Sequence, residues 1–208
     1  MLSKRLVATL KALEGVDPRY GISAAIKVLH QHLDVYYTDP EGWQELASMY
    51  LDQGQLPAAL SALEELMLLM PQNGFYVLQY AETLYTAGEY ATAYKSYLRV
   101  LDMGATVEKP SSKVRGEDRE GERSDKGPEL RALWGLKATV TKLREASTTG
   151  ALSKKQQQQQ EADGIKAESL DDVEQLVTDL ILNRAYASGG AKKADVASLA
   201  AARRVLSS

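Results

Sequence analysis

The two histidines are the first residues to test for chemistry, because an imidazole can bind a metal ion or transfer a proton near neutral pH. His30 and His32 are two positions apart in a segment that we expect to be helical. Side chains with this spacing on a helix point in directions about 200° apart, which is too divergent for a shared metal ion. We therefore interpret each histidine as a residue of the helix surface or of its packing.

Adjacent carboxylates are the second candidate, because a pair that faces one site can carry general acid–base catalysis. Such pairs occur at Glu64-Glu65 and at Asp171-Asp172. Adjacent residues of a helix diverge, and neither pair has a histidine or a nucleophile near it in the sequence. We interpret both pairs as parts of solvated helix faces.

A segment near the C-terminus, Ser188-Gly-Gly-Ala-Lys-Lys193, superficially resembles a phosphate-binding loop. It lacks the P-loop spacing, and no strand is expected before it, so we predict a turn between the last two helices. No Ser/His/Asp arrangement can be assembled from the sequence either. We therefore predict that the chain is not an enzyme and has no catalytic residue, cofactor, metal or small-molecule substrate.

Composition limits the remaining functions. Cysteine is absent, which excludes disulfides and thiolate metal sites and is compatible with a reducing compartment. No apolar run approaches the roughly 18 to 20 residues that span a bilayer, so we expect no transmembrane span. Residues 1–103 contain seven Lys/Arg and twelve Asp/Glu, and this acidic balance argues against a nucleic-acid partner. We expect a soluble chain that faces the cytosol.

The sequence contains an internal repeat with a period of 34 residues, which is the length of a tetratricopeptide repeat. Within each copy, apolar residues are spaced by three and four, which predicts two amphipathic helices joined at a glycine. The pairs matched by this shift are Gly54 and Gly88, Ala59 and Ala93, Ala47 and Ala81, Leu46 and Tyr80, Tyr50 and Leu84, and Leu63 and Tyr97.

The first clear copy begins at Pro40. Asp39 provides an N-cap and Pro40 a proline at the first helical position. Gly54 ends this helix, and the next one starts at Leu56-Pro57. The residues that define the repeat in this copy are Trp43, Leu46, Ala47, Tyr50, Gly54, Ala59 and Pro71.

The next copy runs from Gly74 to about Met103. Upstream, residues 19–36 are expected to form the second helix of a preceding copy, and Lys4 to Glu14 its first helix. Downstream, Arg131–Leu136 resembles another first helix, and two amphipathic segments after Ser169 predict a final helical pair. The repeat-defining residues of the copy that starts at Gly74 are Tyr80, Ala81, Gly88 and Ala93.

Two polar segments interrupt this pattern. Twelve of the nineteen residues from 108 to 126 are charged, and five consecutive glutamines occupy 156–160. We expect disorder or low complexity there, either as insertions tolerated at solvent-facing turns or as regulatory or partner-binding segments. The predicted fold is an all-α tetratricopeptide-type helical-hairpin solenoid with two such insertions. Its parts are repeats at 1–103, a charged linker at 104–127, a partial-repeat helix at 128–146, a Gln-rich linker at 147–168 and a C-terminal helical pair at 169–206.

Repeats of this type bind partners in a groove lined by their first helices. The expected groove is mixed polar and aromatic and suits a helix or an extended segment. An alternative is that its large side chains, Leu51, Phe75 and Tyr85, pack between repeats. The expected groove residues are Glu41, Gln44, Ser48, Leu51, Phe75, Leu78, Glu82 and Tyr85.

Chaperone adaptors with this repeat clamp a C-terminal carboxylate with lysine, arginine and asparagine. Here the corresponding positions carry Gln44, Glu45, Ser48, Leu78 and Glu82. Glutamates would repel a carboxylate, so this subclass is not expected.

Several strings go beyond the general repeat pattern. In chain order, they resemble the family of subunit 2 of the endoplasmic reticulum membrane protein complex, over most of residues 20–206 outside the linkers. The strings are Trp43-Gln-Glu-Leu-Ala-Ser-Met-Tyr50, Leu63-Glu-Glu-Leu-Met67 with Pro71-Gln-Asn73, Gln79-Tyr-Ala-Glu82 followed by Tyr85, Arg131-Ala-Leu-Trp-Gly-Leu136, and Asn183-Arg-Ala-Tyr186.

The resemblance implies a non-catalytic scaffold that binds other subunits of a membrane-bound insertase. It would act peripherally on the cytoplasmic face of the endoplasmic reticulum and support insertion of transmembrane segments. The family has further repeats upstream, so a start at Met1 suggests a fragment or a shortened gene product. The alternative is an unrelated cytosolic adaptor or co-chaperone of the same repeat type that binds a soluble partner.

Overall fold

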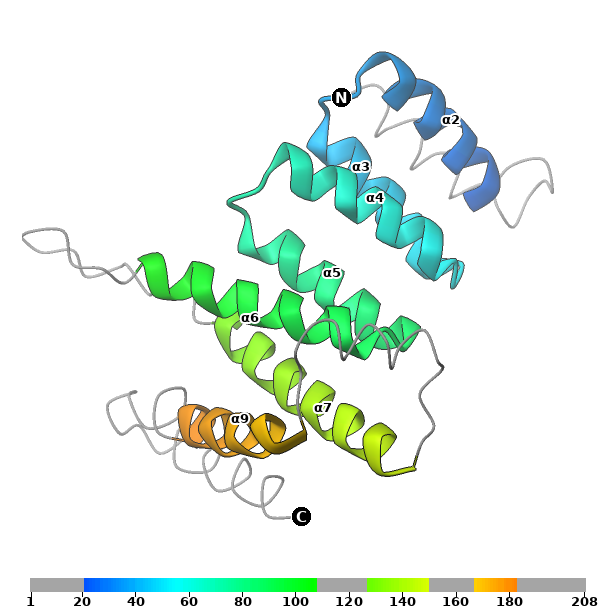
Figure 1. The fold of residues 1–208 in the computed structure, drawn as a ribbon. Coiled ribbons are helices and arrows are strands. Elements are labelled where there is room, and N and C mark those ends of the chain that lie inside the picture. The colour runs from blue at the N-terminus through cyan, green and yellow to red at the C-terminus, as the bar shows by residue number, and fades with distance from the viewer. Residues whose placement is uncertain (1–20, 108–126, 150–166, 183–208) are drawn as a thin grey trace, which may run out of the picture. The chain divides into compact units, whose positions relative to one another are not determined.

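The computed structural model describes residues 21–107, 127–149 and 167–182 (Figure 1). The expected helix at 4–14, the segments 108–126 and 150–166, and everything from 183 onward, including the turn expected at 188–193, lie outside the described residues. Every regular element in the described part is helical, so the predicted all-α class of tetratricopeptide-type hairpins is confirmed. The helices are α2 (Ile22–Val35), α3 (Pro40–Asp52), α4 (Leu56–Leu69), α5 (Gly74–Ala87), α6 (Tyr90–Val107), α7 (Gly127–Thr149) and α9 (Ala167–Leu180).

The chain forms two compact units, Met1–Ala87 and Gly88–Ser208. This division falls between the two helices of the repeat expected at 74–103, whereas the first boundary predicted from the sequence follows residue 103. In a repeat array each helix contacts mainly its neighbours in sequence. A division between any two successive helices is therefore compatible with the repeat pattern.

In the first unit, local signals set the helix ends. Asp39 is the N-cap of α3, where its side chain accepts a hydrogen bond from the backbone N–H of Glu41, and Pro40 follows at the first position. After α3, Gly54 has a φ of 68°, a left-handed conformation that glycine adopts without steric cost. Gly88, which follows α5, has a φ of 82°.

The core of the first unit is an apolar layer between successive helices, with α3 packed on α2 and α4, and α4 packed on α5. Small residues allow these close approaches, because Ala47 and Ala59 are completely buried. Trp43 and Tyr50 pack against the core as partly buried side chains. The main cluster comprises Ala25, Ile26, Leu29, Leu33, Leu46, Ala47, Met49, Ala62, Leu63 and Leu66.

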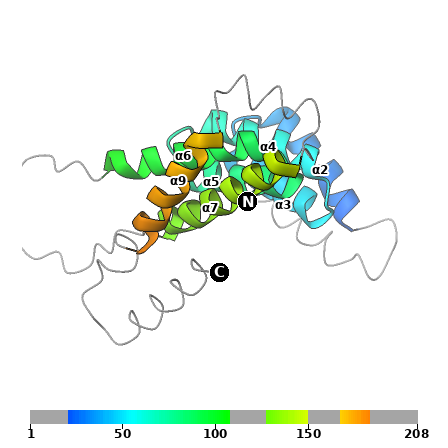
Figure 2. The same ribbon diagram turned by 60° about the horizontal axis from the view of Figure 1, so that its bottom comes forward.

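In the second unit, α7 packs on both α6 and α9, and Figures 1 and 2 show these helices side by side. Gly135 of α7 lies against the ring of Tyr97 of α6. Large apolar side chains of α7 and of the α9 region are buried in this unit. They are Leu136, Val140 and Leu143 from α7 and Leu170, Val177 and Ile181 at and just beyond α9.

Helix bounds in the second unit differ from the predicted ones. Helix α6 continues to Val107 instead of ending near 103, and Gly104 lies inside it without a positive φ. Glycine ends a helix mainly when it takes the left-handed conformation, so Gly104 is no stop signal here. Helix α7 spans 127–149 instead of 128–146. Helix α9 starts at Ala167, two residues before Ser169, whereas the sequence predicts its start after Ser169.

Candidate protein-binding surface

The predicted groove residues belong to α3 and α5, the first helices of two successive repeats, which both pack on α4 in the first unit. A side-chain hydrogen bond of 3.3 Å also joins the two helices, donated by the Tyr76 hydroxyl to Gln44 Oε1. The structure thus brings α3 and α5 together as neighbouring parts of one surface.

Seven of the eight predicted groove residues keep some exposure. Leu78 is the exception, because it is only 1% exposed. We correct its assignment, since a fully buried leucine is held by packing and is not open to a partner. Phe75 is exposed, and the partly exposed residues are Gln44, Ser48, Leu51, Glu82 and Tyr85, while Glu41 is exposed at the start of α3.

Tyrosine hydroxyls connect neighbouring helices around this surface. The hydroxyl of Tyr50 in α3 lies 2.7 Å from Nε2 of His30 in α2. The hydroxyl of Tyr80 in α5 donates to Glu64 Oε1 in α4 at 2.8 Å. Burial, this hydrogen bond and the nearby charge of Glu64 all raise the pKa of Tyr80. Tyr80 therefore stays neutral and acts as a donor. The hydrogen bonds of His30 and Glu64 join neighbouring helices.

His32, the second histidine, also connects two helices. Nε2 of His32 in α2 lies 3.1 Å from Oδ2 of Asp39, the N-cap of α3. Burial by itself would raise the pKa of Asp39. The hydrogen bonds from His32 and from the backbone N–H groups of Gly42 and Glu41, with the charge of His32, outweigh burial and lower this pKa. Asp39 is thus held as a carboxylate that caps α3 and links it to α2.

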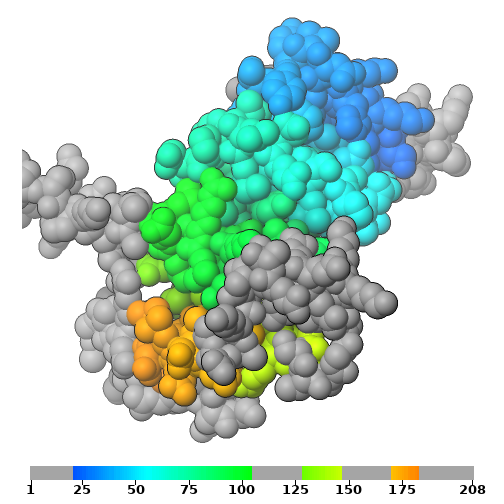
Figure 3. Space-filling model, in the orientation of Figure 1, coloured from blue at the N-terminus to red at the C-terminus, as the bar shows by residue number. Residues whose placement is uncertain are grey.

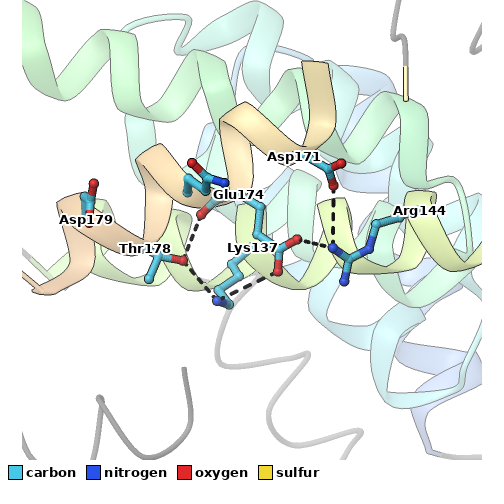
Figure 4. A pocket seen from close by; sticks show the side chains of 7 residues that line it. Lys137, Arg144, Asp171, Glu174, Thr178 and Asp179 are labelled. Atoms are coloured by element: carbon cyan, nitrogen blue, oxygen red, sulfur yellow. Dashed lines mark hydrogen bonds and ion pairs between the residues drawn. The ribbon is translucent and has the colours of Figure 1, made fainter. Parts of the chain in front are cut away.

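The second unit contains a charged pocket of about 600 Å³ between α7 and α9 (Figure 4). Glu174 lies 2.8 Å from Arg144 and 3.9 Å from Lys137. Lys137 also donates to the Thr178 hydroxyl at 3.0 Å, and Arg144 lies 3.6 Å from Asp171. Two basic side chains of α7 thus form ion pairs with two acidic side chains of α9, and these ion pairs connect the two helices.

The sequence predicts neither this pocket nor the contact of Tyr76. Asp171 is exposed, as expected for a solvated face, although one of its oxygens faces Arg144. A weak signal was available, because Lys137 and Arg144 are seven residues apart and therefore share one face of α7. Nothing local indicates that the opposing helix places Glu174 between them.

The described residues contain neither a candidate metal site nor a candidate membrane span. Within 21–107, 127–149 and 167–182, no cluster of three or more His, Cys, Asp or Glu side chains could hold a metal ion. In the same ranges, no helix has the length and apolar character needed to cross a membrane.

Successive antiparallel helices, glycine-ended turns, buried alanines at close approaches and a 34-residue period define a protein of the tetratricopeptide-repeat type. No protein-family model matches the chain. Curated relatives nevertheless confirm the predicted resemblance: the chain is similar to ER membrane protein complex subunit 2 of several organisms.

The chain is 42% identical to ER membrane protein complex subunit 2-A of Xenopus laevis over 66 residues, which are 32% of this chain and 22% of that relative. It is 42% identical to subunit 2-B of Xenopus laevis over 82 residues, 39% of this chain and 28% of that one. It is 34% identical to subunit 2 of Dictyostelium discoideum over 108 residues, 50% of this chain and 32% of that one. The chain thus spans less than a third of each relative.

A solved structure, the Sgt2 TPR domain from Aspergillus fumigatus, covers 73% of this chain, and 84% of that domain is covered. The TM-score is 0.46, and the sequence identity is 18%.

Proposed function

We propose that this chain is a non-catalytic scaffold subunit of the endoplasmic reticulum membrane protein complex. It would bind other subunits on the cytosolic face and so support the insertion of transmembrane segments. The observation that carries this proposal is the 42% identity to ER membrane protein complex subunit 2 of Xenopus laevis. In this proposal the protein is peripheral, and its partners hold it at the membrane.

The surface of α3 and α5 supports a binding role. Exposed and partly exposed groups there alternate between polar side chains, such as Ser48, and aromatic ones, such as Tyr85. Hydrogen bonds such as that from Tyr76 to Gln44 hold neighbouring helices together, so the surface is ordered before a partner binds. A pre-ordered surface loses less conformational entropy on binding.

Affinity purification of the tagged chain from cells tests this proposal. We expect other subunits of the membrane complex to copurify, and we expect Ser48→Arg to reduce their recovery severalfold. Ser61→Arg is the matched control, because Ser61 is an exposed serine of α4 outside the proposed groove. The proposal is refuted if wild-type protein recovers no subunit of a membrane complex.

The same repeat type also fits a cytosolic adaptor or co-chaperone that binds a soluble partner, because the similarity covers less than a third of each relative. The purification distinguishes the two functions. A dominant soluble partner, lost in Ser48→Arg and retained in Ser61→Arg, would support the adaptor.

A further inference from the structure

The described part of the first unit is strongly acidic. Residues 21–87 contain one lysine, Lys27, and no arginine, against eight Asp and Glu residues. At neutral pH these side chains give a formal charge of 1 − 8 = −7 with histidines neutral. Such a concentration of one sign attracts cationic partners and repels anionic ones.

The same unit exposes apolar side chains at one end of its helices. Because successive helices are antiparallel, the α2–α3 turn and the α4–α5 turn lie at the same end, and the α3–α4 turn lies at the other (Figure 1). Val35 and Leu68 are each 73% exposed and Tyr36 is 60% exposed. We call this surface the apolar turn end, and it consists of Val35, Tyr36, Tyr37, Leu68, Met70 and Phe75.

Contacts within the first unit hold the α2–α3 turn of this surface in place. The Tyr37 hydroxyl donates to Glu65 of α4, and the Tyr37 ring contacts the Trp43 ring edge-on with centroids 5.8 Å apart. The Trp43 indole N–H donates to the Tyr37 carbonyl oxygen at 2.8 Å. These contacts fix the α2–α3 turn to α3 and α4. Figure 3 shows the surface of the first unit, coloured by residue number.

Acidic side chains stand beside the apolar ones. Asp34 directly precedes Val35, and Glu64 and Glu65 lie one turn before Leu68 on α4. Lys27, the one lysine of residues 21–87, lies seven residues before Asp34 on α2, about 10 Å further from this end. The surface thus combines apolar side chains with a rim of negative charge.

We propose that the apolar turn end binds a basic amphipathic segment of a partner protein, whose apolar residues cover Tyr36, Leu68 and Phe75 and whose lysines or arginines face Asp34 and the neighbouring glutamates. Charge complementarity selects this partner, because an acidic segment or a second copy of this acidic unit would be repelled. Exposed apolar patches with polar rims mark interaction sites. The inference does not depend on membership of a membrane complex.

The test measures binding of synthetic peptides to the full chain by fluorescence anisotropy. The probe is an 18-residue helical peptide with leucines at i, i+3, i+4 and i+7 spacing and lysines at the flanking positions. The control peptide has the same leucines and glutamates in place of the lysines. We expect the lysine peptide to bind, binding to weaken as salt screens the charges, and the glutamate peptide to bind at least about tenfold more weakly.

Matched pairs of variants test whether the lysine peptide binds at the apolar turn end. Tyr36→Ser combined with Leu68→Ser should weaken the lysine peptide at least about tenfold, whereas Leu98→Ser, which changes an exposed leucine of the second unit, should not. Asp34→Lys should weaken binding severalfold. Asp52→Lys makes the same charge change at the end of α3, on the opposite end of the hairpins, and should have little effect.

Three outcomes would overturn the proposal: no binding of the lysine peptide, equal binding of both peptides, or equal effects of Asp34→Lys and Asp52→Lys. Sedimentation velocity tests the competing occupant. A concentration-dependent dimer that Tyr36→Ser with Leu68→Ser abolishes would assign the surface to a second copy and would also overturn it. Circular dichroism should show unchanged helix content in every variant, since all the changed side chains are exposed.

Discussion

Gly135 of α7 packs so closely on Tyr97 of α6 that a Cβ added to it would stand 2.7 Å from the Tyr97 hydroxyl oxygen. Tyr97 is 2% exposed, so its ring has little room to move. The two helices approach so closely that only glycine, which has a hydrogen atom as its side chain, fits at position 135.

Gly135→Ala should therefore destabilise the protein by about 1 to 3 kcal/mol, the usual cost of overpacking a buried contact. The sign of the change in unfolding free energy is informative, because Gly→Ala at an open position inside a helix stabilises a protein by up to about 1 kcal/mol. Gly104→Ala provides that control, since Gly104 lies inside α6 and its Cβ would meet nothing within 4 Å. Urea unfolding of both variants measures the difference, and a stabilising Gly135→Ala would show that the contact is not close.

Ala59 and Ala93 are completely buried. Replacing either with arginine should unfold the hairpin that contains it, because a long charged side chain neither fits nor finds a partner there. Ser61→Arg is the control on the exposed face of α4. Far-UV circular dichroism and thermal melts should show a loss of helicity in Ala59→Arg and in Ala93→Arg but not in Ser61→Arg. Unchanged melting of the two alanine variants would contradict the repeat register.

The features that could be predicted from the sequence are those with local causes. Asp39 and Pro40 begin α3 because a capping carboxylate and a proline act within one helical turn. Gly54 and Gly88 follow α3 and α5 with positive φ because glycine tolerates that conformation. The resemblance of residues 131–136 to a first helix of a repeat predicted a helix there, and α7 spans these residues.

The remaining features depend on contacts between helices, which spacing along one helix does not reveal. Leu78 is buried although its register position predicts a groove residue. Leu176 belongs to the amphipathic segment expected after Ser169 but is 59% exposed, whereas Leu170, Val177 and Ile181 are buried. The hydrogen bond between Tyr76 and Gln44 joins residues 32 positions apart, and no local pattern indicates it.

Gly54 provides a test of backbone strain without steric clash. Its φ is +68°, and a Cβ there would meet nothing within 4 Å. Gly54→Ala should cost about 1 kcal/mol from the left-handed backbone alone, and Gly54→Asn should cost less, since asparagine tolerates this conformation. Gly74→Ala is the control, because its surroundings are equally open and its φ is not positive. Equal stabilities of the alanine and asparagine variants would argue against this cause.

Asp39 should make stability depend on pH. Its folded-state pKa is lowered from 3.8, because hydrogen bonds and the charge of His32 outweigh burial. A lowered pKa means that the carboxylate's contribution is present above pH 3.8 and is lost as pH falls through the folded-state pKa. Asp39→Asn keeps a capping oxygen but removes the charge. Wild type should therefore be more stable than Asp39→Asn at pH 7, and the difference should shrink below about pH 4.

Urea titrations of both proteins from pH 7 to pH 3 measure this difference. Asp52→Asn makes the same substitution at an exposed position at the end of α3, and it serves as the control for removing a carboxylate that does not cap a helix. A difference in stability between wild type and Asp39→Asn that stays constant or widens as the pH falls below about 4 would show that His32 and the backbone N–H groups do not favour the carboxylate.

Glu174 should be the central ion of the α7–α9 contact. Glu174→Gln leaves Lys137, which is 18% exposed, without its carboxylate, and we expect a loss of about 1 to 2 kcal/mol. Asp171→Asn removes the more exposed partner of Arg144, 62% exposed and 3.6 Å away, and should cost less than about 0.5 kcal/mol. Lys137→Met combined with Glu174→Leu should recover part of the loss, because the two charges then leave the interface together. Equal losses in Glu174→Gln and Asp171→Asn, measured by chemical unfolding, would show that burial does not strengthen the inner pair.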